Sequence, residues 1–368
     1  MSRYAGRNAQ GENMLRVIHF DHPQWVPALV GFLPACGVKY GEALDDLKLA
    51  HPRLFPGLRK TEQHEAPVFQ EFYVQGKTTD CWGCVWDNLH GGMVGQVVGH
   101  PLADWSAFDT WAAHRPDPIK QGILGPRDWE AFAKEVQYKK EIGHFSPDGA
   151  LAHGFHYMLL CDLRGFENLM MDMATDNPLL YTLIDVLIDY NAKVVAKQLE
   201  LGCEFLGLAE DLGMQHTLPI SPELWRKFVK PGYEATAGQA RDREIPVFLH
   251  SDGHILPIIP DLIETGIRVL NPQIRANGLQ GLKDVAKGKV TICLDLDRQL
   301  FPFASPAQLE QHVADVFEAL YLPEGGLIIN VEIGEDVSLE SMDVIFGAVE
   351  RYCKLPDPET TGGVSVGF

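Results

Sequence analysis

The sequence is short of positive charge. It has 31 lysine and arginine residues against 50 aspartate and glutamate residues, which gives a formal net charge of −19 at pH 7. A nucleic-acid backbone or an anionic membrane surface attracts basic proteins, so this balance argues against both as partners. An acidic surface of this kind also favours solubility.

Long hydrophobic runs are missing too. No apolar stretch approaches the ~18 residues that a membrane-spanning helix needs, and the first residues lack the apolar core of a signal peptide. We therefore expect no membrane association and a cytoplasmic location. The seven cysteines are scattered along the chain, which suits a reducing compartment better than a disulfide scaffold.

Several common catalytic sequence patterns are absent. There is no Walker loop, no GxSxG nucleophile elbow and no GxGxxG that follows a strand. Cys81 and Cys84 form a single CxxC pair, and a structural zinc needs a second pair or histidines at matching spacing. We therefore interpret these two thiols as buried structural residues.

The chain instead contains a series of short apolar runs that each end in polar residues. The runs are residues 205–209, 245–249, 268–270, 290–294 and 327–329. The polar residues that follow them are Glu210 and Asp211, His250 and Asp252, Asn271 and Gln273, Asp295, and Asn330 and Glu332. Such runs suit strands that are buried on both faces, and a helical pattern follows each one. Polar groups at the carboxyl ends of parallel strands form the active site of a (β/α)8 TIM barrel, so we predict an α/β barrel enzyme.

The domain organisation is predicted around this barrel. Residues 1–70 are rich in prolines and aromatics and are expected to form an irregular N-terminal extension packed on the barrel. Residues 71–355 are expected to form the barrel, and residues 356–368 a loose tail rich in glycine and proline. Within the barrel, we expect residues 80–86 to be a strand or a strand end and residues 150–159 to be a strand.

A metal site is the strongest chemical prediction. His250 and Asp252 are two residues apart, so in an extended chain their side chains project to one face, where they can bind a metal or act as an oriented base. The alternative is a neutral histidine beside an aspartate that caps the helix starting at residue 255. Glu332 ends the last strand among apolar residues, so it must be paired, protonated or metal-bound. We predict His250, Asp252 and Glu332 as the metal ligands.

Other residues are predicted to line the mouth of the barrel. Glu210 and Asp211 point to opposite faces of a regular strand, so only one of them can do so. Asp295 shares a face with Asp297, and the spacing leaves open whether they bind a nearby arginine or the substrate. The predicted substrate-binding residues are Trp82, Trp86, His153, Asp211, Gln273 and Asp295, and the predicted catalytic residues are Asp80, Glu210 and His250.

Several segments of the chain resemble the uroporphyrinogen decarboxylase superfamily. The segments are residues 163–170, 210–213, 220–225, 229–231, 250–254, 259–264 and 270–273. The resemblance runs from about residue 70 to residue 352 and is strongest over residues 205–275. It implies a TIM barrel with its active site at the mouth.

True decarboxylases of this superfamily carry an N-terminal segment whose arginines bind the carboxylates of the substrate. This chain has no such segment, and residues 31–34 are no substitute for it. Asp80 resembles the pyrrole-binding aspartate of the family by its position. Without the arginines, and with so negative a chain, a tetrapyrrole octaacid is a poor substrate.

The second functional group of the superfamily is the corrinoid-linked methyltransferases, which move a methyl group between a small substrate and the cobalt of a corrinoid protein. They hold zinc through His-x-Cys and a second cysteine near the end of the last strand. The matching positions here are His250, Asp252 and, near the end of the last strand, Glu332, so carboxylates replace both thiolates. The resemblance implies zinc as a cofactor, with the corrinoid (cobalamin) carried by a partner protein.

A site of histidine and carboxylates is harder than a thiolate site and suits an oxygen ligand. We therefore expect a small methoxylated, aromatic methyl donor that is demethylated onto the corrinoid protein. One alternative is a cofactor-free decarboxylase or lyase that acts on a small acid, with Asp80 and His250 as acid and base. Another is a non-catalytic member that binds a ligand or the corrinoid partner. A homodimer is a further expectation.

Overall fold

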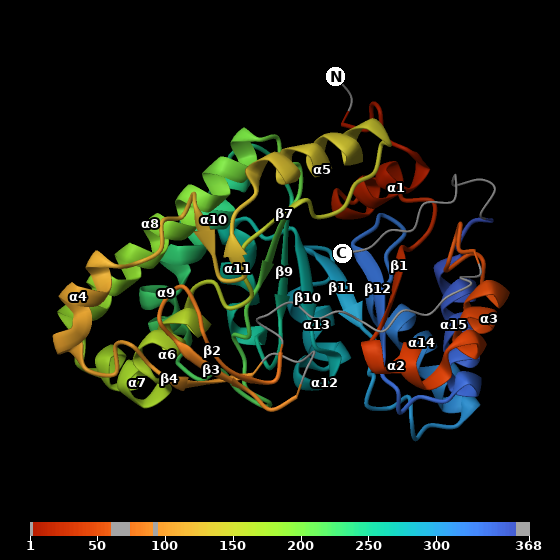
Figure 1. Ribbon diagram of the computed structural model, residues 1–368. Coiled ribbons are helices and arrows are strands. Elements are labelled where there is room, and N and C mark those ends of the chain that lie inside the picture. Colours follow the sequence, from red (N-terminus) through yellow and green to blue (C-terminus); the bar gives the residue numbers. More distant parts are fainter. Residues whose placement is uncertain (1–2, 60–73, 91–94, 358–368) are drawn as a thin grey trace.

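The computed structural model describes residues 3–59, 74–90 and 95–357. Its centre is a curled sheet of parallel strands in the order β1-β12-β11-β10-β9-β8-β7 (Figure 1). The strands are β1 (Ala28–Phe32), β7 (Gly149–Ala150), β8 (Leu206–Ala209), β9 (Val247–Ser251), β10 (Val269–Pro272), β11 (Thr291–Asp295) and β12 (Leu327–Ile333). This sheet confirms the predicted TIM-barrel-like fold, with seven strands among the described residues where eight were expected.

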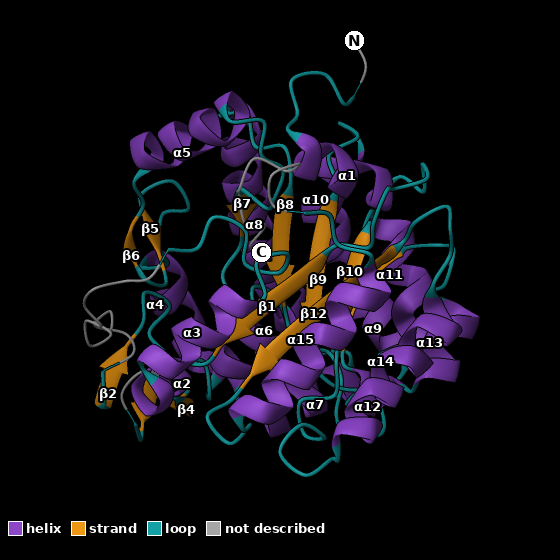
Figure 2. Cartoon of the chain, turned by 90° about the vertical axis from the view of Figure 1, so that its right-hand side faces the viewer, coloured by secondary structure: helices purple, strands orange, loops and turns teal. Residues whose placement is uncertain are grey.

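Helices surround the sheet, and Figure 2 shows the strands running through the middle of the molecule between them. The α-helices are α1 (Ala9–Ile18), α2 (Pro34–Tyr40), α3 (Glu42–Ala50), α4 (Phe108–Ala113), α5 (Trp129–Glu141), α6 (Tyr157–Arg164), α7 (Phe166–Thr175), α8 (Pro178–Glu200), α9 (Pro222–Phe228), α10 (Lys230–Arg241), α11 (Ile259–Thr265), α12 (Ile274–Asn277), α13 (Leu279–Val285), α14 (Pro306–Leu320) and α15 (Leu339–Cys353). Two short 3-10 helices are η2 (Trp105–Ala107) and η3 (Leu256–Ile258).

Several of these helices begin where the sequence supplies an N-cap. Ser221 accepts a hydrogen bond from the backbone N–H of Leu224 at the start of α9, and Ser338 caps α15 in the same way. Ser305 and Gln308 form a reciprocal capping box at the start of α14. A proline follows the cap of α9 and of α14, because the first helical position needs no N–H donor.

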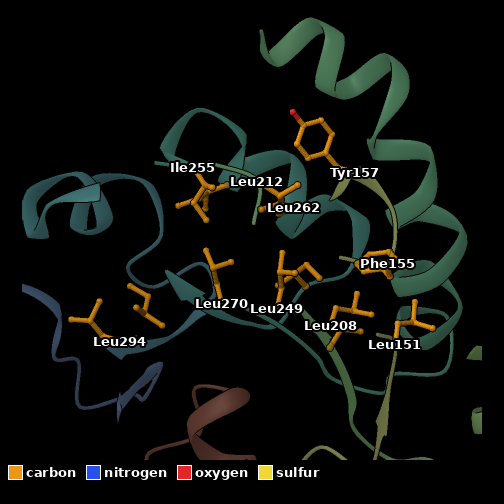
Figure 3. Packing of buried hydrophobic residues seen from close by; sticks show 14 of the residues in the cluster. Leu151, Phe155, Tyr157, Leu208, Leu212, Leu249, Ile255, Leu262, Leu270 and Leu294 are labelled. Atoms are coloured by element: carbon orange, nitrogen blue, oxygen red, sulfur yellow. The ribbon is translucent and has the colours of Figure 1, made fainter. Parts of the chain in front are cut away.

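A row of leucines from neighbouring strands forms part of the core (Figure 3). In register, Leu208 lies beside Leu249, and Leu249 lies beside Leu270. All three are buried, and each buried leucine side chain contributes roughly 1.5–3 kcal/mol to stability. Because side chains alternate along a strand, the residue after Leu249, His250, projects to the opposite face. The same packing that buries the leucines therefore directs His250 away from them.

The N-terminal region differs from the prediction. The barrel sheet includes β1, which pairs in parallel with β12, so the expected boundary at residue 70 does not separate an extension from the barrel. Residues 80–86 are not a barrel strand. They form the turn and the first part of the second strand of a small antiparallel sheet of β2 (Gly76–Thr79), β3 (Val85–Asn88) and β4 (Gln96–Gly99). A further ribbon pairs β5 (Gln121–Gly122) with β6 (Gly125–Pro126).

The prediction of a strand over residues 150–159 is wrong beyond its first residue. Strand β7 ends at Ala150, and α6 begins at Tyr157. The reason is tertiary: the buried carboxylate of Glu210 accepts hydrogen bonds from the backbone N–H groups of His156 and Met158, which satisfies donors at the start of a helix.

The predicted tail overlaps residues 358–368, which lie outside the described residues. Among the helices that the structure describes, none has the length and hydropathy to cross a membrane.

Candidate metal and substrate site

A compact group of polar side chains lies at the carboxyl ends of β8 and β9. Asp211, His250 and Asp252 each offer a ligand atom, and these atoms all lie within 4.8 Å of one another. His250 Nε2 is 3.4 Å from Asp252 Oδ1, and Asp211 Oδ1 accepts a 3.3 Å hydrogen bond from the backbone N–H of Asp252. We call these three residues the acid–histidine cluster.

The imidazole of His250 is held in one orientation by Asn271. Its Nδ1 lies 2.6 Å from Asn271 Oδ1, while the amide nitrogen of Asn271 donates to the Cys293 carbonyl and to Asp295. Because that amide oxygen can only accept, Nδ1 carries the proton and Nε2 faces the carboxylates. Burial alone lowers the pKa of His250, but the hydrogen bonds with Asp252 and Asn271 outweigh it and raise that pKa to about 9.

A second histidine lies beside the cluster. His153 Nε2 is 3.3 Å from Asp211 Oδ1, and the ring centroids of His153 and His250 are 6.2 Å apart. The hydrogen bond with Asp211 raises the pKa of His153 despite partial burial. Burial raises the pKa of Asp211, but the hydrogen bonds from His153 and the Asp252 N–H, together with the nearby histidine charges, outweigh it, so the pKa of Asp211 is lowered overall. The acid–histidine cluster and His153 together place two histidines and two carboxylates at one point of the mouth.

The donor set fits a divalent metal ion. One imidazole and two carboxylates are common ligands of zinc, and a metal-binding histidine usually donates its other ring N–H to a fixed acceptor, as His250 does to Asn271. The oxygen-rich composition makes the set harder than a thiolate site. Asp211, His250 and Asp252 are the residues that would hold the ion.

Two cavities border the acid–histidine cluster. The first, about 570 Å³ and here called the polar cavity, is lined by residues that include His250, Asp252, Gln273, Asp295, Arg275, Arg298 and Glu332. The second, about 970 Å³ and here called the aromatic cavity, is lined by residues that include Trp86, Arg127, Trp129, Phe132, His153, Asp162 and Asp211. The acid–histidine cluster thus lies between the polar cavity, which many charged side chains line, and the largely apolar aromatic cavity.

Four of the predicted substrate-binding residues besides Asp211 line these cavities. Gln273 and Asp295 lie in the polar cavity, and Trp86 and His153 lie in the aromatic cavity. Trp82 does not: its side chain is 5% exposed and packs against the rings of Trp111 and Tyr190. The bulk of this indole is used for packing, and its role in substrate binding stays a prediction.

The third predicted metal ligand, Glu332, is outside the cluster. It lines the polar cavity, is 42% exposed, and forms an ion pair with Arg298 at 2.5 Å. Asp211 takes its place in the group that the structure brings together. For Asp295 and Asp297, the sequence left open whether they bind an arginine or the substrate. Asp297 pairs with Arg275, whereas Asp295 accepts hydrogen bonds from two asparagines.

The structure places Asp80 in the turn between β2 and β3, and its catalytic role stays a prediction. Its carboxylate accepts hydrogen bonds from the backbone N–H groups of Trp82 and Cys84, both at 2.9 Å, and from the indole of Trp86 at 2.8 Å. The residue is 8% exposed, and burial raises its pKa. It is absent from the described lining of both cavities, so its oxygens stabilise the hairpin.

Glu210 and Asp211 face opposite ways, as the alternation predicted. Glu210 is fully buried, accepts from the N–H groups of His156 and Met158, and accepts from the Tyr233 hydroxyl at 2.8 Å. Burial raises its pKa to about 7. These partners all belong to the fold, so Glu210 joins α6 and α10 to β8, and it is not among the residues that line the two cavities.

Sequence reasoning missed two residues that matter at the site. Asn271 is visible as a polar residue at a strand end, but nothing in its spacing shows that it orients a histidine on the neighbouring strand. Arg127 lies in the loop before α5, outside the regular barrel pattern, and the sequence gives no signal that it reaches a cavity.

The sequence matches a known protein family over its C-terminal half. Residues 156–352 match the model of the uroporphyrinogen decarboxylase (URO-D) family, which is more than half of the chain. The chain belongs to the uroporphyrinogen decarboxylase family. No curated protein matches the sequence.

Solved structures show similarity of fold. A methyltransferase from Methanosarcina mazei is 14% identical, with 94% of this chain and 99% of that chain covered and a TM-score of 0.58. A B12-independent methionine synthase from Shewanella sp. W3-18-1 is 8% identical over 63% of this chain and 69% of that chain, with a TM-score of 0.39. A dihydropteroate synthase from Xanthomonas albilineans is 16% identical over 47% of this chain and 62% of that chain, with a TM-score of 0.31.

Proposed function

We propose that the protein is a metal-dependent methyltransferase that removes a methyl group from a small methoxylated aromatic compound and delivers it to a corrinoid carried by a partner protein. The observation that carries the proposal is the acid–histidine cluster of Asp211, His250 and Asp252 at the edge of an aromatic cavity. The shared fold with a methyltransferase from Methanosarcina mazei agrees with this class of enzyme.

The cluster supplies the metal-binding part of the proposal. When bound, zinc would act as a Lewis acid toward the ether oxygen, which would make the phenoxide a better leaving group. The chain's own contribution is preorganisation: Asn271 holds Nδ1 of His250, and the backbone N–H of Asp252 holds Asp211. Carboxylate ligands favour an oxygen-bearing substrate over a thiol.

The aromatic cavity supplies the substrate-binding part. Trp129 and Phe132 pack edge to face with ring centroids 5.9 Å apart, and the indole N–H of Trp86 is fixed by Asp80. Aromatic walls of this kind bind a planar ring and exclude water from the reacting end. His153 and Asp211 are the polar residues at the end that borders the cluster.

The decarboxylase alternative loses its acid in this structure. It relied on Asp80, whose two carboxylate oxygens already accept three hydrogen bonds from the hairpin. A group engaged in this way inside a turn is poorly placed to donate a proton to a substrate.

The test combines metal analysis with a methyl-transfer assay. We expect the purified full-length protein to bind zinc in equimolar amount and to methylate cob(I)alamin from a methoxyarene, seen as a change in cobalt absorbance. His250→Ala is expected to lose both properties. The matched control is His254→Ala, because His254 lies on the same loop but bonds the Ala276 carbonyl. Zinc content unchanged in His250→Ala, or no methoxyarene turned over by wild type, contradicts the proposal.

A further inference from the structure

Arg127 is a cation with few partners in the aromatic cavity. Its Nη2 donates a 3.2 Å hydrogen bond to the Tyr190 hydroxyl, while Nε is buried and has no hydrogen-bond partner. The guanidinium lies over the rings of Trp129 and Tyr190, at 5.6 and 5.9 Å from their centroids. Among the described residues, no carboxylate forms an ion pair with it. A guanidinium has five N–H donors, so most of the binding capacity of Arg127 is unused.

The two arginines of the polar cavity provide the contrast. Arg275 pairs with Asp297 at 2.8 Å, and Arg298 pairs with Glu332 at 2.5 Å. A partly buried cation without a counter-ion is costly, because it has lost hydration and gained no opposite charge. An anionic ligand at Arg127 would supply that charge, whereas Arg275 and Arg298 already have theirs.

The other charged residues of the aromatic cavity define where an anion can lie. Arg127 is the only lysine or arginine among the described lining residues. Asp211 stands at the cluster end, and burial raises the pKa of Asp162 to about 7. Asp128 is exposed and accepts a hydrogen bond from the Ala131 N–H at the start of α5. A negative group therefore binds best at Arg127, away from Asp211.

We propose that the aromatic cavity selects aromatic methyl ethers that bear a carboxylate, with the carboxylate on Arg127 and the methoxy group toward Asp211. A planar guanidinium matches a carboxylate through two parallel hydrogen bonds, which fixes the direction of the ligand as well as its affinity. The ring then lies along the aromatic walls. The assignment of the methoxy end rests on the proposed function, whereas the role of Arg127 rests on the cavity alone.

Calorimetric binding of a matched ligand pair tests this inference. The probes are 3-methoxybenzoate and its neutral analogue 3-methoxybenzamide, titrated into the zinc-loaded full-length protein without any corrinoid. We expect the carboxylate to bind roughly tenfold to hundredfold more tightly, which is the usual gain from charge-assisted hydrogen bonds. Equal affinity for the two ligands in wild type overturns the inference.

Variants locate the effect. Arg127→Met is expected to remove the preference for the carboxylate, and Arg127→Lys to restore part of it. Arg115→Met is the matched control, because Arg115 is an exposed arginine outside both cavities. A preference that survives in folded Arg127→Met places the anion elsewhere and overturns the inference. If Arg127→Met does not fold, the ligand pair on wild type still decides.

The binding test and the methyl-transfer assay can refute the anion site and the proposed function separately. Arg127-dependent carboxylate binding without any methyl transfer would remove the proposed function and keep the anion site. Methyl transfer with equal use of the benzoate and the benzamide would keep the function and remove the anion site.

Discussion

The two cavities at the mouth of the barrel differ in how their charges are compensated. In the polar cavity, Arg275 and Arg298 each pair with a carboxylate of the same chain. In the aromatic cavity, Arg127 donates to the Tyr190 hydroxyl and has no carboxylate partner among the described residues. The arginines of the polar cavity therefore have counter-ions within the chain, whereas Arg127 in the aromatic cavity has none among the described residues.

Removal of Asn271, which orients His250, is expected to have the largest effect. Asn271→Ala takes away the acceptor that orients His250, so metal affinity is expected to fall roughly 10- to 100-fold, as is usual for the loss of a residue behind a metal ligand. Competition with a chelator measures the zinc dissociation constant. Asn330→Ala is the matched control, because Asn330 bonds Asp295 and does not touch the histidine. Equal losses in the two variants would show that Asn271 has no special role.

The second prediction separates two adjacent acids. Glu210→Gln replaces an acceptor that serves two backbone N–H groups and the Tyr233 hydroxyl, so we expect the free energy of unfolding to fall by about 2 kcal/mol. Zinc binding should persist. Asp211→Asn is expected to lose zinc while its free energy of unfolding changes little. Urea denaturation and zinc analysis measure the two properties. Loss of zinc in folded Glu210→Gln would contradict the assignment of Glu210 to the fold.

Phe132 forms part of the aromatic wall of the aromatic cavity. Phe132→Ala shortens the aromatic wall, so we expect KM for the methoxyarene to rise roughly tenfold, the effect of losing about 1.4 kcal/mol of contact, with kcat and zinc content unchanged. Phe303→Ala is the control, since Phe303 is 87% exposed and lies outside both described linings. A fall in kcat with constant KM would be the wrong signature for a wall residue.

The smallest effect concerns a charge remote from both cavities. His51 lies 3.1 Å from Glu350 and 3.0 Å from Asp343, and the hydrogen bond with Glu350 raises the pKa of His51 above 6.5 despite burial. The folded state holds this proton more tightly, so the contribution is complete below pH 6.5 and is lost as pH rises through the folded pKa.

Urea unfolding at several pH values measures this contribution. His51→Gln is expected to lower the free energy of unfolding at pH 6 by on the order of 1 kcal/mol, the value of a typical hydrogen bond, and by less at pH 9. Metal binding and methyl transfer should not change with it. A difference between the two proteins that grows with pH would contradict the sign of the pKa shift.

The sequence predicted the strands that carry the site because their signal is local. Apolar runs that end in polar residues describe β8, β9 and β10 well, and alternation alone directs Glu210 inward and Asp211 to the mouth. The same reasoning could not choose Asp211 over Glu332 as the third member of the cluster. That choice depends on Arg298, which comes from a loop and reaches Glu332 only in the folded chain.

The larger errors come from long-range contacts. Residues 150–159 look like a strand, but Glu210 satisfies the first N–H groups of α6 from another strand. The apolar pattern of β1 did not stand out among prolines and aromatics, although its pairing with β12 makes it part of the barrel. Asp80 was assigned by resemblance, and only the hairpin contacts show where its oxygens bind.

Zinc content measured in two matched variants decides whether Asp211 belongs to the metal site. Asp211 lies in the acid–histidine cluster, and Glu332 lines the neighbouring cavity in an ion pair with Arg298. We expect folded Asp211→Asn to lose stoichiometric zinc and Glu332→Gln to retain it. Zinc retained by Asp211→Asn and lost by Glu332→Gln would show that the metal is held at Glu332 and not at Asp211.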